Sequence, residues 1–520
     1  MTTTLPQILR SAANKLPNQE SFRFGSDSLN YKELDVKTDK LASHLNAKGV
    51  KKGDRIGVYM FRSLETAIAM YGIMKTGAAF VPLDPGLPIS RINYLLNDCG
   101  IEHVITNPNL HRKHRKILEH KSPLKSFIGV RLNTDFETIS WDDIFNITLE
   151  NFIEIPINEN DLAYIMYTSG STGFPKGIMH THKSGLSYAR LSVNLFKINE
   201  DDRLASHAPL HFDISTLGYL AGPLAMATTI IISEAHTKMA PSLAALIEQE
   251  KITIWYSVPL ALVQLLQSNS IQKMNLSALR LFLFGGEVFA NKFLNELMHL
   301  CPEAKFYNVY GPAEVNQCTC YHIKKPPLKK DVIPIGQVWE ETEFIILDKQ
   351  GRKINNNDYG ELAIHSSTMM KGYWNNQTLT NKSTYVAIQG ELEKKFFKTG
   401  DMVKMNETGD FHFKGRNDRQ VKIRGYRIEI DEIEAALLTH EKIIEAAVIV
   451  LQKNESEKEV MAAVIVDQSC TIGSKELLEH CRGSLPSYAV PQSIEIMPDF
   501  PRTGSGKIDR KEIIKTYIKI

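Results

Sequence analysis

Short apolar runs alternate with stretches of helical periodicity along most of the chain. The runs are rich in β-branched and aromatic residues, which is typical of buried strands. They are "RIGVYM" (residues 55–60), "AAFVPL" (78–83), "EHVIT" (102–106), "LAYIMYT" (162–168), "TTIIIS" (228–233), "ITIWYSV" (252–258) and "LRLFLFGG" (279–286). Helical patterns such as "SLETAIAMYGIMKTG" (63–77) and "SLAALIEQEK" (242–251) lie between them. The alternation predicts an α/β fold with doubly wound parallel sheets.

The pattern changes at about residue 336. From there to residue 414, glycine-punctuated strand-like runs follow one another without obvious helices, as in "EFIILDKQGRKI" (343–354) and "GDFHFKG" (409–415). This texture predicts a small antiparallel or barrel-like part. Farther on, a helix from Asp431, the strands "AAVIV" (446–450) and "MAAVIV" (461–466), and a helix near "SKELLEHCR" (474–482) predict a compact α+β unit. Asp431 and Glu434 have the spacing of a capping box at the start of the first helix.

Length and composition refine this picture. A chain of 520 residues is too long to fold around one hydrophobic core. We therefore expect a large N-terminal domain over residues 1–416 and a smaller C-terminal domain over residues 417–520. The net charge of +2 gives no reason to expect a nucleic-acid or membrane partner. The start of the chain lacks a signal-peptide pattern, and glycine, proline and threonine interrupt the most apolar window, residues 217–232. The six cysteines form no CxxC pair and no zinc spacing, which favours reduced thiols in a cytoplasmic protein.

The stretch "YTSGSTGFPKG" (residues 167–177) combines glycines, hydroxyl side chains and one lysine directly after an apolar run. It is not a Walker P-loop, because the lysine follows Gly173 too late and Gly177 has no hydroxyl for a metal. Its glycines still let backbone N–H groups approach an anion, and its hydroxyls add donors. A glycine-rich surface turn is the alternative interpretation. The candidate phosphate-binding residues are Thr168, Ser169, Gly170, Ser171, Thr172, Gly173 and Lys176.

This stretch resembles the phosphate loop of the adenylate-forming superfamily, which contains acyl-CoA synthetases, luciferases and the adenylation domains of nonribosomal peptide synthesis. The resemblance covers nearly the whole chain, because further motifs follow in the order of that family. They are "LNYKELD", "MKTGAAFVPLDP", "FDIS", "NVYGPAE", "GELAIHSSTMMKGYW", "FKTGD", "GRNDRQVKIRGYRIE", "LPSYAVP" and "GSGKIDR". So many motifs in order are far more specific than any one of them.

The resemblance implies that a substrate carboxylate attacks the α-phosphorus of ATP, and that a thiol then displaces AMP from the acyl adenylate. It implies that Tyr310 lies against adenine, that Asp401 and Arg416 hold the ribose, and that Glu314 binds Mg²⁺. Lys507 is implied as the catalytic lysine, together with Lys176 on the phosphates, and Asp418 as the hinge of a mobile C-terminal domain. Asn308 and Gly311 complete the expected ATP site. One departure is Ala313, where the family usually has a threonine.

By the same matching, Asp213 of "FDIS" is expected to bind the α-ammonium of an amino-acid substrate, since a buried ammonium requires a counter-charge. An aspartate that caps the next helix is the alternative. The other residues expected around the substrate are Ile214, Leu217, Tyr256, Leu283, Gly285, Val309, Gln317, Cys318 and Lys507. This mostly apolar set is similar to that of the free-standing prolyl-activating members. Gln317 departs from the aliphatic residue expected there, and it leaves a substrate with a polar or hydroxylated side chain, or D-alanine, open.

No carrier domain is expected after Lys507, because only thirteen residues follow it. The acceptor thiol is therefore expected to be the phosphopantetheine of a separate carrier protein. The leading hypothesis is an enzyme that activates proline or another small, mostly apolar amino acid and loads it onto that carrier. A carboxylic acid:CoA ligase and a D-alanine:carrier protein ligase are the alternatives within the family. A regulatory ATP-binding protein without turnover is the alternative from another class, and only Ala313 favours it.

Overall fold

The computed structural model describes residues 2–149, 155–170, 174–389, 392–454, 457–467, 472–503 and 508–518. The chain divides into two compact units. The first contains residues 1–85, 95–167 and 177–417, and the second contains residues 86–94, 168–176 and 418–520. Part of the predicted phosphate loop therefore belongs to the second unit.

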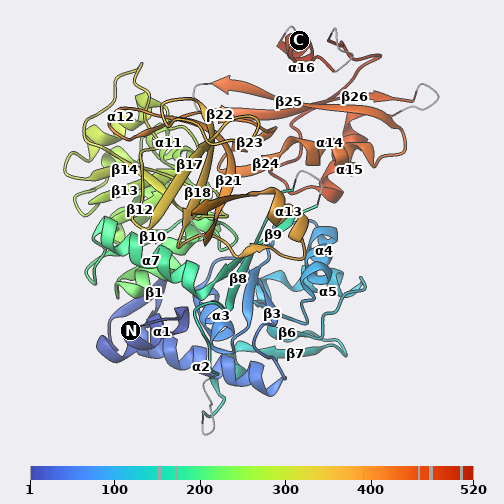
Figure 1. Cartoon of the computed structure of the whole chain (residues 1–520). Coiled ribbons are helices and arrows are strands. Elements are labelled where there is room, and N and C mark those ends of the chain that lie inside the picture. The colour runs from blue at the N-terminus through green and yellow to red at the C-terminus, as the bar shows by residue number, and fades with distance from the viewer. Residues whose placement is uncertain are drawn as a thin grey trace. The chain divides into compact units, whose positions relative to one another are not determined.

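An eight-stranded sheet in the described residues has the order β19-β9-β8-β4-β3-β5-β6-β7. Figure 1 labels β3, β6, β7, β8 and β9 of this sheet. Its strands are β3 (Arg55–Tyr59), β4 (Ala79–Pro82), β5 (His103–Thr106), β6 (Ser126–Gly129), β7 (Glu137–Ser140), β8 (Leu162–Thr168), β9 (Lys176–Thr181) and β19 (Gly372–Tyr373). β3 to β8 pair in parallel, whereas β19 runs antiparallel to β9. The parallel pairing confirms the prediction from the apolar runs between residues 55 and 168.

A nine-stranded sheet, counted in the same described ranges, has the order β16-β15-β14-β13-β12-β10-β11-β1-β2. Its strands are β1 (Glu20–Phe24), β2 (Asp27–Asn30), β10 (Arg203–Ser206), β11 (Thr228–Ile231), β12 (Ile254–Ser257), β13 (Leu281–Gly285), β14 (Lys305–Tyr310), β15 (Thr319–Ile323) and β16 (Gln337–Val338). The five strands from β10 to β14 pair in parallel. The carboxyl ends of parallel strands share one edge of the sheet, and ligands commonly bind at that edge.

Helices cover the sheets of the first unit. They are α1 (Leu5–Lys15), α2 (Tyr31–Ala47), α3 (Leu64–Lys75), α5 (His111–Leu118), α6 (Trp141–Phe145), α7 (His182–Phe196), α8 (Gly222–Leu224), α9 (Glu234–Lys238), α10 (Ala240–Gln249), α11 (Pro259–Gln267) and α12 (Asn291–Leu300). Helix α4 (Ile89–Cys99) has residues in both units. The predicted helices at residues 63–77 and 242–251 correspond to α3 and α10.

The nine-stranded sheet is buried on both faces, as its continuous apolar runs require. Along β12, Ile254 and Tyr256 join a core with α1, α2, α3 and α7, whereas Trp255 joins a second core with α10, α11 and α12. The period of two follows from the alternation of side chains along a strand. Leu283 on β13 and Val309 on β14 face the same core as Tyr256.

The last part of the first unit in sequence forms an antiparallel sheet. It has the order β17-β18-β21-β20, with β22 paired to β21. Its strands are β17 (Thr342–Leu347), β18 (Gly360–Ser366), β20 (Thr384–Gln389), β21 (Leu392–Met405) and β22 (Phe411–Arg416). The antiparallel part is as predicted, but the short helix α13 (Gln377–Lys382) was not predicted.

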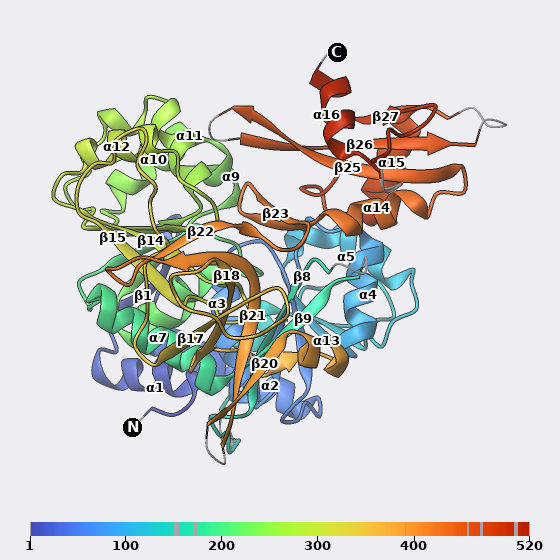
Figure 2. The same cartoon turned by 45° about the horizontal axis from the view of Figure 1, so that its top comes forward.

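The second unit contains a long antiparallel pair, β25 and β26, with helices beside it (Figure 2). Its elements after residue 418 are β23 (Gln420–Ile423), β24 (Tyr426–Glu429), α14 (Ile430–Leu438), β25 (Ile443–Asn454), β26 (Glu457–Val466), α15 (Ser474–Ser484), β27 (Ile494–Ile496) and α16 (Arg510–Ile518).

The predicted capping box at α14 is wrong. The residue before the helix is Glu429, and Asp431 already lies in the first turn. Arg419 pairs with both Asp431 and Glu434 instead, with its Nη2 atom 2.7 Å from Glu434 Oε1. The two carboxylates therefore bind a guanidinium and do not cap the backbone.

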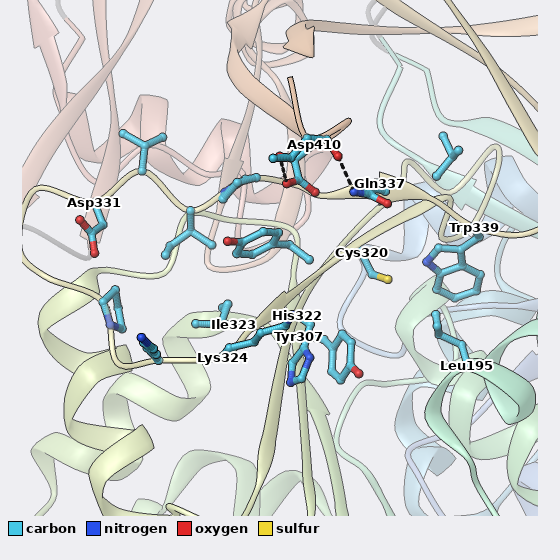
Figure 3. A pocket seen from close by; sticks show the side chains of 18 of the residues that line it. Leu195, Tyr307, Cys320, His322, Ile323, Lys324, Asp331, Gln337, Trp339 and Asp410 are labelled. Atoms are coloured by element: carbon cyan, nitrogen blue, oxygen red, sulfur yellow. Dashed lines mark hydrogen bonds between the residues drawn. The ribbon is translucent and has the colours of Figure 1, made fainter. Parts of the chain in front are cut away.

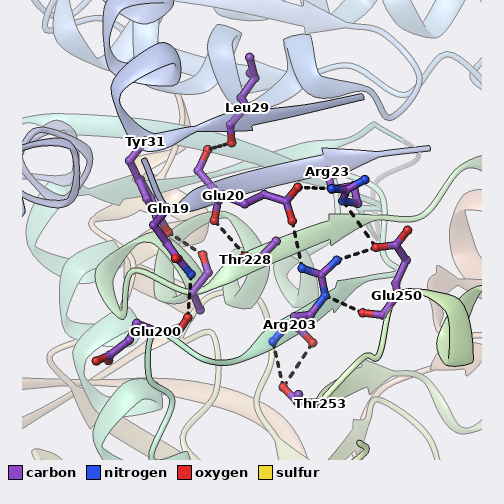
Figure 4. A network of polar contacts seen from close by, with 12 residues as sticks. Gln19, Glu20, Arg23, Leu29, Tyr31, Glu200, Arg203, Thr228, Glu250 and Thr253 are labelled. Carbon is purple, nitrogen blue, oxygen red and sulfur yellow. Dashed lines mark hydrogen bonds and ion pairs between the residues drawn. The ribbon is translucent and has the colours of Figure 1, made fainter. Parts of the chain in front are cut away.

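A network of charged side chains connects β1, β10 and the end of α10 at the amino end of the nine-stranded sheet (Figure 4). Arg203 is the first residue of β10. Its Nη1 atom lies 3.0 Å from Oε2 of Glu20 on β1, and its Nη2 atom lies 2.5 Å from Oε2 of Glu250 after α10. Arg23 pairs with Glu20 at 2.5 Å. The network lies at the opposite end of β10 from Asp213, so it stabilises the scaffold and takes no part in the site described below.

No helix in the described part of the chain is both long enough and apolar enough to cross a membrane. The most apolar window of the sequence instead contains a π-helical turn, Leu217–Ala221, followed by α8 and β11.

Candidate active site

Three predicted nucleotide-binding residues meet at the carboxyl end of β14. The hydroxyl of Tyr310 donates to Asp401 Oδ2 at 2.6 Å, and Arg416 Nη1 donates to Asp401 Oδ1 at 2.5 Å. Asp401 lies on β21 opposite Arg416 on β22, and this register brings the ion pair together. Burial, with the Asp401 carboxylate as the next contribution, raises the pKa of Tyr310 well above its usual range. A carboxylate group therefore lies beside an aromatic ring, an arrangement that suits a ribose diol next to a purine.

Glu314 lies in the turn after β14 and is fully buried. The hydroxyl of Tyr373, on β19, donates to Glu314 Oε1 at 2.7 Å. The backbone N–H of Met370 donates to the Glu314 carbonyl at 2.7 Å. Two contacts from the region around β19 therefore fix the side chain and backbone of Glu314.

His180 supports the same turn from β9. Its Nε2 atom lies 2.9 Å from the carbonyl oxygen of Ala313, and only an N–H group can bond to a carbonyl. Nε2 therefore carries the proton. Burial lowers the pKa of His180 to about 4, so the ring is neutral near pH 7. The turn that carries Glu314 is held by a neutral hydrogen bond at Ala313.

Gly311 and Asn308 shape the chain around Tyr310. A Cβ atom at Gly311 would lie 1.8 Å from the carbonyl oxygen of Asn316, so the turn closes on itself only with glycine. The side-chain amide of Asn308 donates to the Pro334 carbonyl at 2.8 Å. In this structure Asn308 thus holds a neighbouring loop.

The predicted phosphate loop is described in part. Ser171, Thr172 and Gly173 lie outside the described residues, as does Lys507. A Cβ atom at Gly170 would lie 2.1 Å from the carbonyl oxygen of Phe174, so the loop requires glycine there. The Thr168 hydroxyl is buried and has no hydrogen-bond partner among the described residues. A buried donor of this kind suits an incoming phosphate oxygen.

Lys176 is the first residue of β9, and it belongs to the second unit together with Thr168, Ser169 and Gly170. Asp418 is exposed and lies between β22 and β23. It is the first residue of the segment 418–520, which belongs to the second unit.

Most residues predicted for the substrate pocket come together in the first unit. Leu217, Tyr256, Leu283 and Val309 share one core, and Ile214 packs against it. Gly285 pairs with Val309 across β13 and β14, and a Cβ atom there would lie 2.3 Å from the Val309 carbonyl oxygen.

Cys318 differs from the other predicted pocket residues. Its side chain packs in another core, with Ile178 and Val315, and its thiol lies 3.6 Å from the Tyr310 carbonyl. Burial raises the pKa of this thiol.

Asp213 is the first residue of a short 3₁₀ helix, Asp213–Ser215, that follows β10. Its Oδ1 atom accepts the backbone N–H of Ile214 at 2.9 Å. Burial, with a further contribution from the Asp213 carboxylate, raises the pKa values of Tyr256, Tyr188 and Tyr164. The Asp213 charge is therefore within electrostatic range of three buried hydroxyls.

Sequence reasoning did not identify Tyr373, His180, Tyr164 or Tyr188. Tyr373 lies within the quoted motif "GELAIHSSTMMKGYW", but the motif does not say which of its residues reaches Glu314. Tyr164 and His180 stack at 4.9 Å between ring centroids, one from β8 and one from β9.

One large pocket, of about 1400 Å³, lies elsewhere in the first unit (Figure 3). It is lined by residues of α7, β15 and β16 and by the loop from Lys324 to Pro334. None of the predicted site residues that the structure describes lines it.

A family described as "AMP-binding enzyme" matches residues 9–374, and one described as "AMP-binding enzyme C-terminal domain" matches residues 432–507. The chain is similar to the L-proline–[L-prolyl-carrier protein] ligase of Streptomyces coelicolor, with 32% identity over 99% of this chain and 97% of that protein. A linear gramicidin synthase from Brevibacillus parabrevis is 30% identical over 98% of this chain, which spans only 6% of that protein.

Among solved structures, NpsA-ThdA is an artificially fused adenylation–PCP di-domain from Klebsiella oxytoca. It matches with a TM-score of 0.80 and 22% identity, over 95% of this chain and 93% of that one. This likeness shows the fold.

Proposed function

This chain belongs to the AMP-binding enzyme family, and from that premise we propose that it activates an amino acid with ATP for transfer to a carrier protein. A carboxylate oxygen of the amino acid attacks the α-phosphorus, the bond to the β-phosphate bridging oxygen breaks, and pyrophosphate leaves. The thiol of a separate phosphopantetheinylated carrier protein then attacks the acyl carbon and AMP leaves. The proposal extends to this chain the activity in the name of the Streptomyces relative, with proline or another small, mostly apolar amino acid as the substrate.

The observation that carries the proposal is the position of Asp213 at the carboxyl edge of the parallel strands, within electrostatic range of Tyr256. A carboxylate beside a mostly apolar pocket suits an amino acid, because its ammonium group requires a counter-charge when it leaves water. A carboxylic acid without an amino group would bring no positive charge to Asp213.

The nucleotide is proposed to bind at Tyr310 and Asp401, with Arg416 holding the Asp401 carboxylate. The adenine ring stacks on Tyr310, and the ribose hydroxyls donate to Asp401. Thr168, Ser169, Gly170, Ser171, Thr172, Gly173 and Lys176 would receive the phosphates. Catalysis of phosphoryl chemistry rests mainly on positioning and charge neutralisation, and these groups supply both.

We propose Mg²⁺ as the metal and Glu314 as its protein ligand. No three His, Cys, Asp or Glu side chains in the described ranges are grouped to hold a metal by themselves. Mg²⁺ commonly binds through one carboxylate together with the phosphates of a nucleotide, so a single buried glutamate fits this ion. When bound, the ion would neutralise charge on the phosphates.

The C-terminal residues complete the proposal. Lys507 is proposed as the catalytic cation, and residues 417–520 as a mobile domain that turns about Asp418 between the two half-reactions. The five described cysteines are free thiols, which supports a proposed cytoplasmic location.

Amino-acid-dependent exchange of pyrophosphate into ATP tests the proposed function. The purified protein is incubated with ATP, Mg²⁺, labelled pyrophosphate and each member of a panel of amino acids. We expect exchange with a small set of amino acids and none without one. Exchange driven only by acids that lack an amino group would overturn the proposal in favour of a carboxylic acid:CoA ligase.

A further inference from the structure

A buried polar pair lies among the residues predicted to surround the substrate. Tyr256, near the end of β12, is 5% exposed, and Gln317, before β15, is 4% exposed. Gln317 Nε2 donates a hydrogen bond to the Tyr256 hydroxyl. The contact joins two segments 61 residues apart, so the fold itself brings these two polar groups together.

The pair has hydrogen-bonding capacity that no described residue uses. Gln317 Oε1 is buried and has no hydrogen-bond partner among the described residues. The oxygen and nitrogen of a side-chain amide are distinguished only by their partners. Exchanging them would leave an N–H group unpaired at the same place, so one amide group is unused in either orientation.

The core that contains Tyr256 is mostly apolar. Tyr256 shares its core with Leu217, Leu283 and Val309, and all four are buried. The only acidic residue expected in the pocket is Asp213, whose charge also acts on Tyr256. The polar pair is therefore a small neutral site at a mostly apolar core, within electrostatic range of the carboxylate proposed to bind the substrate ammonium.

We propose that the amino acid is one whose short, mostly apolar side chain carries a hydroxyl group, and that this hydroxyl bonds to Gln317 and Tyr256. The inference rests on the proposed function and narrows its substrate. A hydroxyl both donates and accepts, so it satisfies the amide in either orientation. A wholly apolar side chain leaves a buried amide group unpaired, which is costly in a binding site. A charged side chain would have no counter-charge at this pair.

Matched substrate pairs test the inference on the unmodified protein. Serine and alanine, threonine and valine, and 4-hydroxyproline and proline differ mainly by one hydroxyl. The measurement is kcat/KM for pyrophosphate exchange with each of the six amino acids. We expect the hydroxylated member of the best-used pair to be preferred by roughly 10- to 100-fold, the range for leaving a buried polar group unpaired.

The variant Gln317→Leu assigns the preference to the amide. Leucine fills a similar volume without a polar group, so the preference is expected to fall to about one, while the KM for ATP stays unchanged. Gln337→Leu is the matched control: Gln337 is exposed, and its amide donates to the Thr408 carbonyl at 2.8 Å, outside the predicted site. We expect this control to keep the preference.

The outcomes separate the two proposals. If the apolar member of each pair is used equally well or better, the inference is overturned, whereas the exchange itself upholds the proposed function. A preference that survives in Gln317→Leu also overturns it, because the amide then does not read the hydroxyl. If no amino acid drives exchange, the proposed function fails, and the inference fails with it.

Discussion

Replacing Tyr373 by phenylalanine removes one hydroxyl group that donates to the buried carboxylate of Glu314. The oxygen atoms lie 2.7 Å apart, and the two residues are 3% and 0% exposed, so solvent cannot readily substitute for the lost donor. A hydrogen bond to a charged group contributes about 1.5–3 kcal/mol. Because Glu314 is the proposed Mg²⁺ ligand, we expect this hydrogen bond to hold its carboxylate in the position that binds the ion.

The full value converts to a decrease of roughly 10- to 100-fold in kcat/KM for pyrophosphate exchange. The Mg²⁺ concentration for half-maximal activity should rise as well, which a purely structural role of Tyr373 would not produce. Titrating MgCl₂ at fixed ATP measures both quantities. Tyr359→Phe is the matched control, because Tyr359 is 48% exposed. Exchange kinetics and Mg²⁺ dependence within twofold of the unmodified protein would refute the reasoning about Glu314.

Three further predictions concern the second unit. Burial raises the pKa of Glu432 to about 7. The folded state therefore holds this proton more tightly than the unfolded state does. The free energy of unfolding should fall by up to ~3 kcal/mol as the pH rises from about 4.5 to 7. Glu432→Gln should flatten that decline in thermal melts recorded across this pH range, and an unchanged slope would exclude Glu432 as its source. Lys507→Ala should abolish pyrophosphate exchange, because the lost cation acts mainly in the transition state. ATP binding, measured by calorimetry, should persist. Near-normal exchange would show that Lys507 has no part in the mechanism. Asp418→Pro fixes φ at the proposed hinge, so adenylate formation should persist while loading of the carrier thiol falls sharply, and an equal loss of both steps would make Asp418 structural.

The fold could be predicted largely from local patterns. The run "ITIWYSV" is mostly apolar, as is typical of a strand buried on both faces, and β12 has one core on each side. Helix α13 could not be predicted in this way, because its sequence "QTLTNK" is short and has no apolar periodicity. At α14 the spacing of Asp431 and Glu434 suggested a cap, but Arg419 competes for both carboxylates, and nothing in the local sequence signals that contact.

The motifs predicted which individual residues belong to the candidate site, but not which of them are in contact. Tyr310, Asp401 and Arg416 come from three motifs, and the structure brings them into one hydrogen-bonded cluster. The support of Glu314 by Tyr373 joins residues 59 positions apart and depends on how β19 pairs with β9. The Tyr256–Gln317 pair likewise depends on the order of strands in the nine-stranded sheet. Such contacts follow from topology, which local patterns do not specify.

The central claim is that Asp213 binds the ammonium group of an amino-acid substrate. Asp213→Asn is the sharpest variant, because an asparagine has a similar shape, retains an oxygen for the Ile214 N–H bond and replaces the negative carboxylate by a neutral amide. The measurement is pyrophosphate exchange by the unmodified protein and the variant, each with the preferred amino acid and with the same acid lacking its amino group. Asp27→Asn, at an exposed aspartate, is the control.

Removing one partner of a buried ion pair costs about 3–5 kcal/mol, which is roughly two to three decades in affinity. We predict that Asp213→Asn loses this much with the amino acid and little with its des-amino counterpart, and that the KM for ATP is unchanged. The four values form a double-mutant cycle whose coupling energy reports the contact between Asp213 and the ammonium. A coupling energy near zero would contradict the claim and would favour a carboxylic acid ligase.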